Sequence, residues 1–208
     1  MKRIAIVLVI IFAASYANAQ ISFGPKIGYN TSKLSVDKSD IKTDLKNSFQ
    51  FGVFLRLGNK IYVQPELTWL TQGGVFKKPG DEGNLSPFKQ EIDLKTVQVP
   101  ALIGYELIDL KIANIRAFAG PVASFVTNKE IDSNESEGYI KPIQEADLKD
   151  ILWSAQIGVG ADVLMFTLDI RYNIGISKVL GDVEYEGEKL TFDSRASGFN
   201  VSLGWKIF

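Results

Sequence analysis

The side chains best suited to chemistry in this chain are carboxylates that recur along extended segments. A site built from Glu66 with Asp162 or Asp169 could perform general acid–base catalysis. Arginines recur in the same segments, however, and Arg171 lies two residues after Asp169, on the same face of a strand. This pattern favours ion pairs over a catalytic pair.

The residue types that the chain lacks narrow the possible functions further. The 208 residues include no histidine and no cysteine, which removes the commonest general base, the commonest transition-metal ligand and all thiolate chemistry. A formal net charge of −1 does not suit a nucleic-acid binder. We therefore expect no enzymatic activity, no cofactor or metal site and no nucleic-acid partner.

A strict alternation of apolar and polar residues runs through the chain. Residues 166–177 read Phe-Thr-Leu-Asp-Ile-Arg-Tyr-Asn-Ile-Gly-Ile-Ser, which gives an extended segment one apolar and one polar face. The pattern recurs at membrane-spanning length, so we expect strands that cross a bilayer. Eight strands are predicted, at 21–30, 48–57, 60–71, 92–105, 111–126, 151–164, 166–178 and 197–208.

The connections between these strands alternate in length. Those at Gly58-Asn59, around Ile108-Asp109 and at Met165 are short. An even strand number with alternating short and long connections is typical of bacterial outer-membrane barrels, whose long loops lie outside. The sequence thus predicts an all-β fold, an eight-stranded antiparallel up-and-down transmembrane β-barrel in the outer membrane of a diderm bacterium. The predicted external loops are 31–47, 72–91, 127–150 and 179–196.

The start of the chain has the pattern of an export signal. Basic residues beginning at Lys2 precede an apolar run, and an Ala-x-Ala pattern ends at Ala19. We expect cleavage between Ala19 and Gln20, which separates a secretory signal peptide at 1–19 from a barrel domain at 20–208.

The polar faces of the predicted strands would line the inside of the barrel. They are rich in glycine and carry charges of both signs. Because an eight-stranded barrel has room only for its own side chains, we expect a filled, non-conducting lumen held by ion pairs. The predicted lumen charge network is Lys26, Arg56, Glu66, Arg116, Asp162, Asp169, Arg171 and Lys206.

Aromatic residues cluster near the ends of the predicted strands, as expected for girdles at the two membrane–water interfaces. The predicted external girdle is Tyr29, Phe49, Trp69, Phe125 and Trp153, and the predicted periplasmic girdle is Phe23, Tyr105, Phe166 and Trp205. Prolines also fall inside the strands, where the missing N–H usually marks an edge or a bulge. We interpret Pro25, Pro65, Pro100 and Pro121 as bulge sites.

An ordered set of short motifs extends over nearly all of residues 20–208. They include Phe23-Gly-Pro-Lys-Ile-Gly-Tyr-Asn30, Val63-Gln-Pro-Glu-Leu-Thr-Trp69, Ala119-Gly-Pro121 and the closing Leu203-Gly-Trp-Lys-Ile-Phe208. Together they resemble the outer-membrane β-barrel family that includes PorT. The resemblance implies the barrel fold and its location, and it offers a role in assembly of a protein-secretion apparatus as an alternative function.

The external loops are the remaining place for function. Loops 127–150 and 179–196 are rich in Asp and Glu, which suits a protein partner or divalent cations. We expect a structural or interaction role through these loops, with membrane lipid around the barrel and the barrel-insertion machinery reading the last strand, which ends at Phe208. A soluble lipocalin-like carrier of a small ligand is a further alternative, and it would require the apolar faces to point inward.

Overall fold

The described part of the chain consists of β-strands and turns. The computed structural model describes residues 20–35, 42–44, 46–78, 88–110, 112–133, 149–179, 182–185, 188–191 and 195–207. The predicted signal peptide, much of the predicted external loops and Phe208 lie outside these ranges. Within the ranges, no helix is both long enough and apolar enough to span a membrane.

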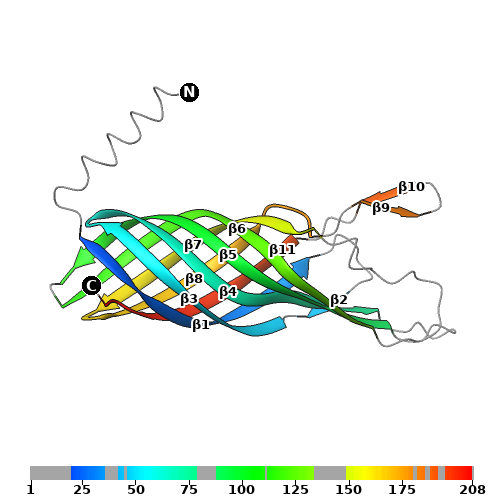
Figure 1. Cartoon of the computed structure of the whole chain (residues 1–208), viewed down its shortest axis with the longest axis horizontal. Helices are drawn as coiled ribbons and strands as arrows, with labels where there is room; N and C mark the ends of the chain where they lie inside the picture. Colours follow the sequence, from blue (N-terminus) through cyan, green and yellow to red (C-terminus); the bar gives the residue numbers. More distant parts are fainter. Residues whose placement is uncertain are drawn as a thin grey trace, which may run out of the picture.

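Eight long antiparallel strands close into a barrel (Figure 1). Each pairs with the next barrel strand along the chain, and the last strand pairs with the first. This arrangement confirms the predicted eight-stranded antiparallel barrel. The barrel strands are β1 (Ile21–Ser35), β3 (Lys46–Gly58), β4 (Ile61–Lys78), β5 (Phe88–Asp109), β6 (Ala113–Ser133), β7 (Ile151–Val163), β8 (Phe166–Gly175) and β11 (Arg195–Trp205).

Three short strands lie at the end of the barrel that carries the long connections. β2 (Lys42–Asp44) pairs with β4 beyond the barrel wall. β9 (Asp182–Tyr185) and β10 (Glu188–Thr191) pair with each other in a separate hairpin (Figure 1).

The barrel strands are strongly tilted because their pairing is staggered around the ring. From Lys26, the paired residues lead through β3, β4, β5 and β6 to Leu152 of β7. In the other direction they lead through β11 and β8 to Asp162 of the same strand. This ten-residue difference is the shear of the barrel. It fits a strand tilt of roughly 35–45° and an interior that side chains alone can fill.

Several strands are longer than the apolar alternation predicted. β4 continues to Lys78 and β6 to Ser133, and β5 already begins at Phe88, so parts of the predicted loops 72–91 and 127–150 are strand. The ladder between β4 and β5 extends as far as the pair Lys78–Phe88. These extensions are held by backbone hydrogen bonds, which form whatever the side chains are. The alternation of apolar and polar side chains, from which the strand bounds were predicted, therefore does not mark where the strands end.

The prolines do not lie at bulges, so that prediction is wrong. The register shifts fall on the β5–β6 ladder, between Lys95 and Thr96 and between Glu106 and Ile108. Successive residues of an antiparallel strand direct their N–H groups to alternate sides, so a proline removes one ladder hydrogen bond without displacing the register. Pairing with at least one neighbouring strand continues unshifted at Pro25, Pro65, Pro100 and Pro121.

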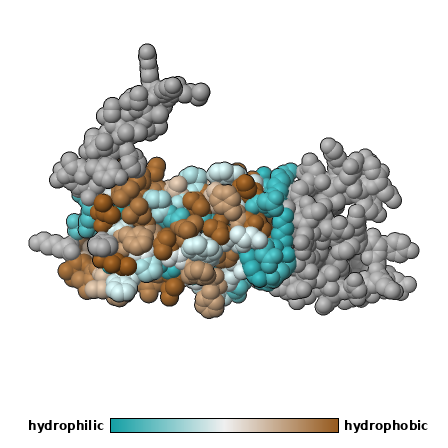
Figure 2. Space-filling view, in the orientation of Figure 1, coloured by the Kyte–Doolittle hydropathy of each residue, from teal (hydrophilic) through white to brown (hydrophobic). Residues whose placement is uncertain are grey.

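The two faces of the barrel wall have opposite polarity. Along β8 the burial alternates at every residue, with Leu168 and Ile170 exposed and Asp169 and Arg171 buried. Figure 2 shows hydrophobic side chains over the barrel wall and a hydrophilic belt at the end near the long connections. The wall therefore exposes apolar side chains and buries polar ones, which is the arrangement required of a barrel surrounded by lipid.

Two short turns place residues at positive φ. Gly58 has φ 125° at the end of β3, and Leu164 has φ 53° in the turn between β7 and β8. A Cβ atom at position 58 would lie 2.3 Å from the carbonyl oxygen of Ile61. Only glycine fits at Gly58, whereas Leu164 occupies a region that asparagine tolerates better than leucine.

We expect Gly58→Ala to lower the free energy of unfolding by about 1–3 kcal/mol, because alanine adds both backbone strain and a clash. Leu164→Asn is expected to leave that free energy unchanged or raise it by up to about 1 kcal/mol. Urea unfolding of barrels refolded in lipid vesicles, followed by tryptophan fluorescence, measures both. Parent-like stability of Gly58→Ala would contradict the assignment of strain to this turn.

Candidate functional site

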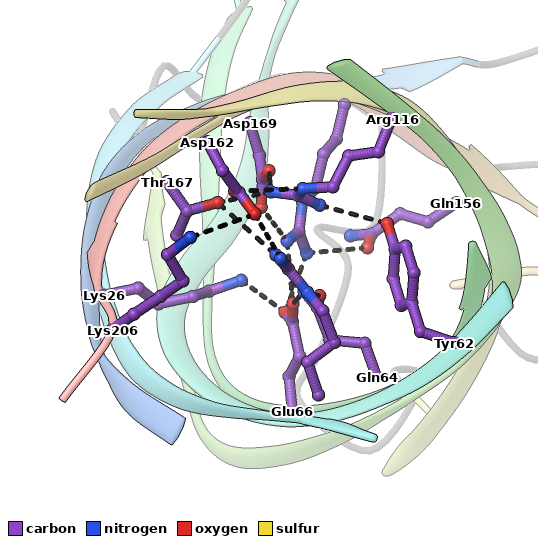
Figure 3. A network of polar contacts seen from close by, with 12 residues as sticks. Lys26, Tyr62, Gln64, Glu66, Arg116, Gln156, Asp162, Thr167, Asp169 and Lys206 are labelled. Atoms are coloured by element: carbon purple, nitrogen blue, oxygen red, sulfur yellow. Dashed lines mark hydrogen bonds and ion pairs between the residues drawn. The ribbon is translucent and has the colours of Figure 1, made fainter. Parts of the chain in front are cut away.

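Strand alternation directs a set of charged side chains into the barrel, where Figure 3 shows them meeting from opposite walls. Six barrel strands contribute to the set, and Lys206 directly follows a seventh, β11. Seven of the eight side chains are buried, and Lys206 is half-buried. The structure brings together all of the charged residues predicted for the lumen, here called the lumen network: Lys26, Arg56, Glu66, Arg116, Asp162, Asp169, Arg171 and Lys206.

Glu66 is held at one end of the lumen network by two cations. Arg171 binds it in a bidentate manner, with Nη1 donating to Oε2 at 2.7 Å and Nη2 donating to Oε1 at 2.7 Å. Lys26 Nζ contacts Oε2 as well, and Gln64 Nε2 donates to Oε1 at 2.6 Å. A buried carboxylate is tolerated when it is paired and hydrogen-bonded in this way.

Asp169 and Asp162 continue the lumen network towards the end with the short turns. Arg171 Nη2 lies 2.5 Å from Asp169 Oδ2, and Arg116 contacts both aspartates, with Nε 3.1 Å from Asp162 Oδ1. Arg56 Nη1 lies 2.5 Å from Asp162 Oδ2. Charges of opposite sign therefore alternate from Lys26 through to Asp162. Each of the three carboxylates in the lumen network, Glu66, Asp162 and Asp169, is bound by at least two cations, which makes each a poor general base.

Aromatic rings line the guanidinium groups of the lumen network. The Phe118 ring centroid lies 5.3 Å from Arg116 Cζ and 5.0 Å from Arg171 Cζ. Tyr62 lies 5.0 Å from Arg56 Cζ and accepts a hydrogen bond of 3.2 Å from Arg116 Nη1. Such cation–π contacts partly replace the hydration that a buried guanidinium loses. These rings were not predicted for the lumen, although Tyr62 and Phe118 lie an even number of residues from Glu66 and Arg116 on the same strands and therefore share their inward face.

Inward-facing glycines make room for the large side chains. A Cβ atom on Gly160 would lie 2.7 Å from Arg116 Cζ, and one on Gly158 would lie 2.6 Å from Phe118 Cε2. One on Gly104 would lie 2.1 Å from Tyr62 Cζ. Gly158 and Gly160 were predicted to face the lumen and Gly104 was not, and all three lie beside the large inward side chains of a neighbouring strand, as expected in a narrow barrel.

The half of the lumen towards the long connections has a different chemistry. Amide and hydroxyl groups bind one another there, with Gln50 Nε2 donating to Asn200 Oδ1 at 3.0 Å and Gln98 Nε2 donating to Ser124 Oγ at 3.0 Å. Several inward side chains are apolar, which corrects the prediction of an interior made of small and charged residues. The buried apolar residues of the interior include Leu70, Leu94, Leu102, Val122 and Leu152.

A cavity of about 810 Å³, here called the vestibule, opens at the end with the short turns. Its inner wall is formed by members of the lumen network, namely Arg56, Asp162 and Lys206. The outer wall includes Asn59 of the turn between β3 and β4 and Asn114 at the start of β6.

All nine residues predicted for the two girdles lie exposed on the outward face of the barrel wall. Tyr29 contacts Phe49 edge-to-face with ring centroids 5.6 Å apart, and Trp69 stacks on Phe51 at 5.4 Å. Phe51 was not predicted to belong to a girdle. The outward pair Tyr172 and Phe199, whose ring centroids are 4.7 Å apart, was not predicted either.

The family of this protein follows from its similarity to known outer-membrane proteins. The family model "Outer membrane protein beta-barrel domain" matches residues 14–181, most of the chain. The chain belongs to this family of outer-membrane β-barrels. Its location is therefore the outer membrane. In such barrels the short turns face the periplasm and the long connections face outward, so the vestibule is periplasmic.

Solved structures of outer-membrane barrels are similar to this one. One is Ail, the attachment invasion locus protein of Yersinia pestis, in complex with the heparin analogue sucrose octasulfate, at 12% identity and a TM-score of 0.45 over 90% of this chain and 99% of that chain. Another is Neisserial surface protein A (NspA), at 14% identity and a TM-score of 0.43 over 90% and 99% of the respective chains. Among the curated proteins, none matches the chain.

The alternative of a soluble lipocalin-like carrier is wrong for this outer-membrane barrel. Such a carrier would bury its apolar residues around a ligand cavity. Here the apolar faces point outward, and the interior contains buried Arg116 and Arg171.

We expect Glu66→Gln to lower the free energy of unfolding by about 3–5 kcal/mol, because it leaves Lys26 and Arg171 buried without their shared carboxylate. Glu130→Gln, in the exposed pair with Lys95, is the matched control and should change it by less than about 1 kcal/mol. Urea unfolding in lipid vesicles measures both variants.

Adding Lys26→Met to Glu66→Gln should recover part of the loss, since it removes the buried charge whose printed ion pair was with Glu66, whereas Arg171 keeps its ion pair with Asp169. Equal losses in Glu66→Gln and Glu130→Gln would show that the lumen network contributes no more than a surface ion pair.

Proposed function

We propose that this outer-membrane barrel is a non-conducting scaffold. Its function would be to bind a protein partner through the residues that extend beyond the external end of the barrel. The observation that carries this proposal is that β4, β5 and β6 continue beyond the external girdle. These parts of the three strands, residues 70–78, 88–96 and 126–133, are here called the external sheet. The filled lumen supports the same proposal.

The lumen supports a non-conducting barrel in both of its halves. On the periplasmic side, the lumen network joins opposite walls by contacts such as Arg56 to Asp162 and Arg171 to Glu66. On the external side, a cavity bordered by Asn30, Gln98, Gln156 and Asn200 offers only about 10 Å³, about the space of one water molecule. A solute passing through would have to separate several buried ion pairs.

Three neighbouring strands project well beyond the external girdle. β4 continues for nine residues after Trp69, and β6 continues for eight residues after Phe125. At about 3.4 Å per residue, these extensions run for roughly 30 Å along the strand direction. An exposed ion pair between Lys95 and Glu130 (2.5 Å) links β5 and β6 on these extensions, and Lys129 of β6 pairs with Asp150, just before β7, at 2.8 Å.

One edge of this external sheet suits the docking of an extended segment. Beyond Val126, which donates its backbone N–H to Asp150 O at 2.8 Å, β6 pairs only with β5 among the described residues. A strand with an open edge can bind an added strand through backbone hydrogen bonds. We infer a protein partner at this edge, and the acidic loops 127–150 and 179–196 would act with it.

Other roles predicted from the sequence have narrower support. An enzymatic role is disfavoured by the pairing of all three lumen carboxylates with arginines. A role in assembly of a protein-secretion apparatus stays a prediction that rests on the resemblance to PorT.

Barrels reconstituted in planar lipid bilayers are expected to produce no unitary conductance steps, because the ion-paired lumen leaves no continuous aqueous path. Vesicles prepared with detergent alone and a porin of known conductance are the negative and positive controls. Reproducible steps of one size from the parent barrel would contradict the non-conducting scaffold.

A photo-cross-linking residue at Asn128, exposed on the external part of β6, is expected to give a discrete protein adduct in intact cells. The same residue at Ile157, on the lipid-facing wall, is the matched control and should give none. Joining Gln72 to Leu94 through an Asn-Gly turn removes the projecting hairpin at a paired position and should abolish the adduct. An adduct that survives this deletion would exclude the external sheet as the docking site.

A further inference from the structure

The vestibule at the periplasmic end has a surplus of positive charge on its inner wall. The lumen network as a whole contains five cations and three carboxylates. Asp162 alone is shared by Arg56 at 2.5 Å, Arg116 at 3.1 Å and Lys206 at 3.4 Å. Since Arg116 is also bound by Asp169, the unmatched charge at this end falls on Arg56 and Lys206, which both line the vestibule.

Lys206 is the cation of this group with the most freedom to bind a ligand. Its ion pair with Asp162, at 3.4 Å, is the longest in the lumen network, and its side chain is 18% exposed. Its backbone is fixed, because Lys206 N donates to Met165 O at 2.7 Å. The ammonium group is therefore held at the inner wall of the vestibule while its donors are not fully used.

A buried polar atom in the vestibule also lacks a partner. Asn114 Nδ2 donates to Glu106 Oε2 at 3.3 Å, but Asn114 Oδ1 accepts no hydrogen bond from any described residue. A buried acceptor without a donor is uncommon in proteins and is usually satisfied by a water molecule or a ligand. A ligand with an N–H or O–H group would satisfy it.

The remaining lining is compatible with a small organic molecule. The volume of about 810 Å³ falls within the roughly 300–1,000 Å³ of typical small-molecule sites. The outer wall carries the carboxylates Glu106 and Asp109 and the apolar side chains Leu107 and Leu164. Among the described residues, the lining carries three cations (Arg56, Lys60 and Lys206) and three carboxylates (Glu106, Asp109 and Asp162), and the two cations of the inner wall share one carboxylate, Asp162.

We propose that the vestibule binds a small anionic ligand from the periplasm. Its carboxylate or phosphate group would contact Lys206 and Arg56, and a hydroxyl, amine or amide group would donate to Asn114 Oδ1. This site lies at the opposite end of the barrel from the external sheet. Ligand binding in the vestibule and partner binding at the external sheet can therefore be tested independently. A charge-assisted contact to an anion is the strong kind of hydrogen bond that such a site requires.

The test is a titration of the ¹⁵N-labelled barrel in detergent micelles with inorganic phosphate and, separately, with acetate, at constant ionic strength set with chloride. We expect saturable shifts of the backbone amide signals of Lys206 and Asn114. Saturation by phosphate alone assigns a phosphoryl ligand, saturation by acetate alone assigns a carboxylate ligand, and saturation by both supports the shared anion site.

Lys206→Gln is expected to weaken this binding about tenfold or more, since it removes a charge-assisted contact. Lys95→Gln is the matched control, because Lys95 is an exposed cation that pairs with Glu130 and does not line the vestibule, and it should bind like the parent. A gel shift on boiling confirms that each variant folds. Absence of saturable shifts with both probes, or equal weakening by the two substitutions, would overturn the proposal.

Discussion

The closure of eight strands with a shear of ten is the constraint on which the rest of this structure depends. It sets an interior just wide enough for side chains, so every inward residue must fit against those of the opposite wall. Arg116, Phe118 and Tyr62 are accommodated because Gly160, Gly158 and Gly104 lie against them. The same closure satisfies the backbone hydrogen bonds within the wall, which lets the outer face be wholly apolar in lipid.

The pairing of charged side chains is the second consequence of this narrow interior. The polar face of each strand points inward, and the arginines and carboxylates on it cannot remain hydrated, so they pair with one another. The alternating order from Lys26 to Asp162 gives each carboxylate two or three cations. Rings at 5.0–5.3 Å from the guanidinium groups add a further favourable contact. The excess of cations is accommodated where the lumen meets water, at the vestibule.

The two ends of the barrel therefore differ in structure, although the same eight strands form both. At the periplasmic end, short turns surround the vestibule, whose inner wall is formed by residues of the lumen network. The external end is continued by β4, β5 and β6, whose backbone pairing persists where the apolar alternation stops. Strand pairing needs only backbone donors and acceptors, whereas contact with lipid needs apolar side chains. The strands can therefore continue beyond the hydrophobic band.

The sequence by itself determined the strands and the face on which each residue lies. An alternation of period two is a local property, and it assigned Glu66, Asp169 and Arg171 inward and the girdle residues outward. Tertiary structure alone decided which inward residues meet. Glu66 binds Arg171 from a strand far along the chain because the stagger of the closed ring brings them to one level. The unshifted register at Pro65 and the length of β4 were likewise decided by pairing with neighbouring strands. Pairing, shear and curvature are properties of the whole ring, and no local pattern of residues encodes them.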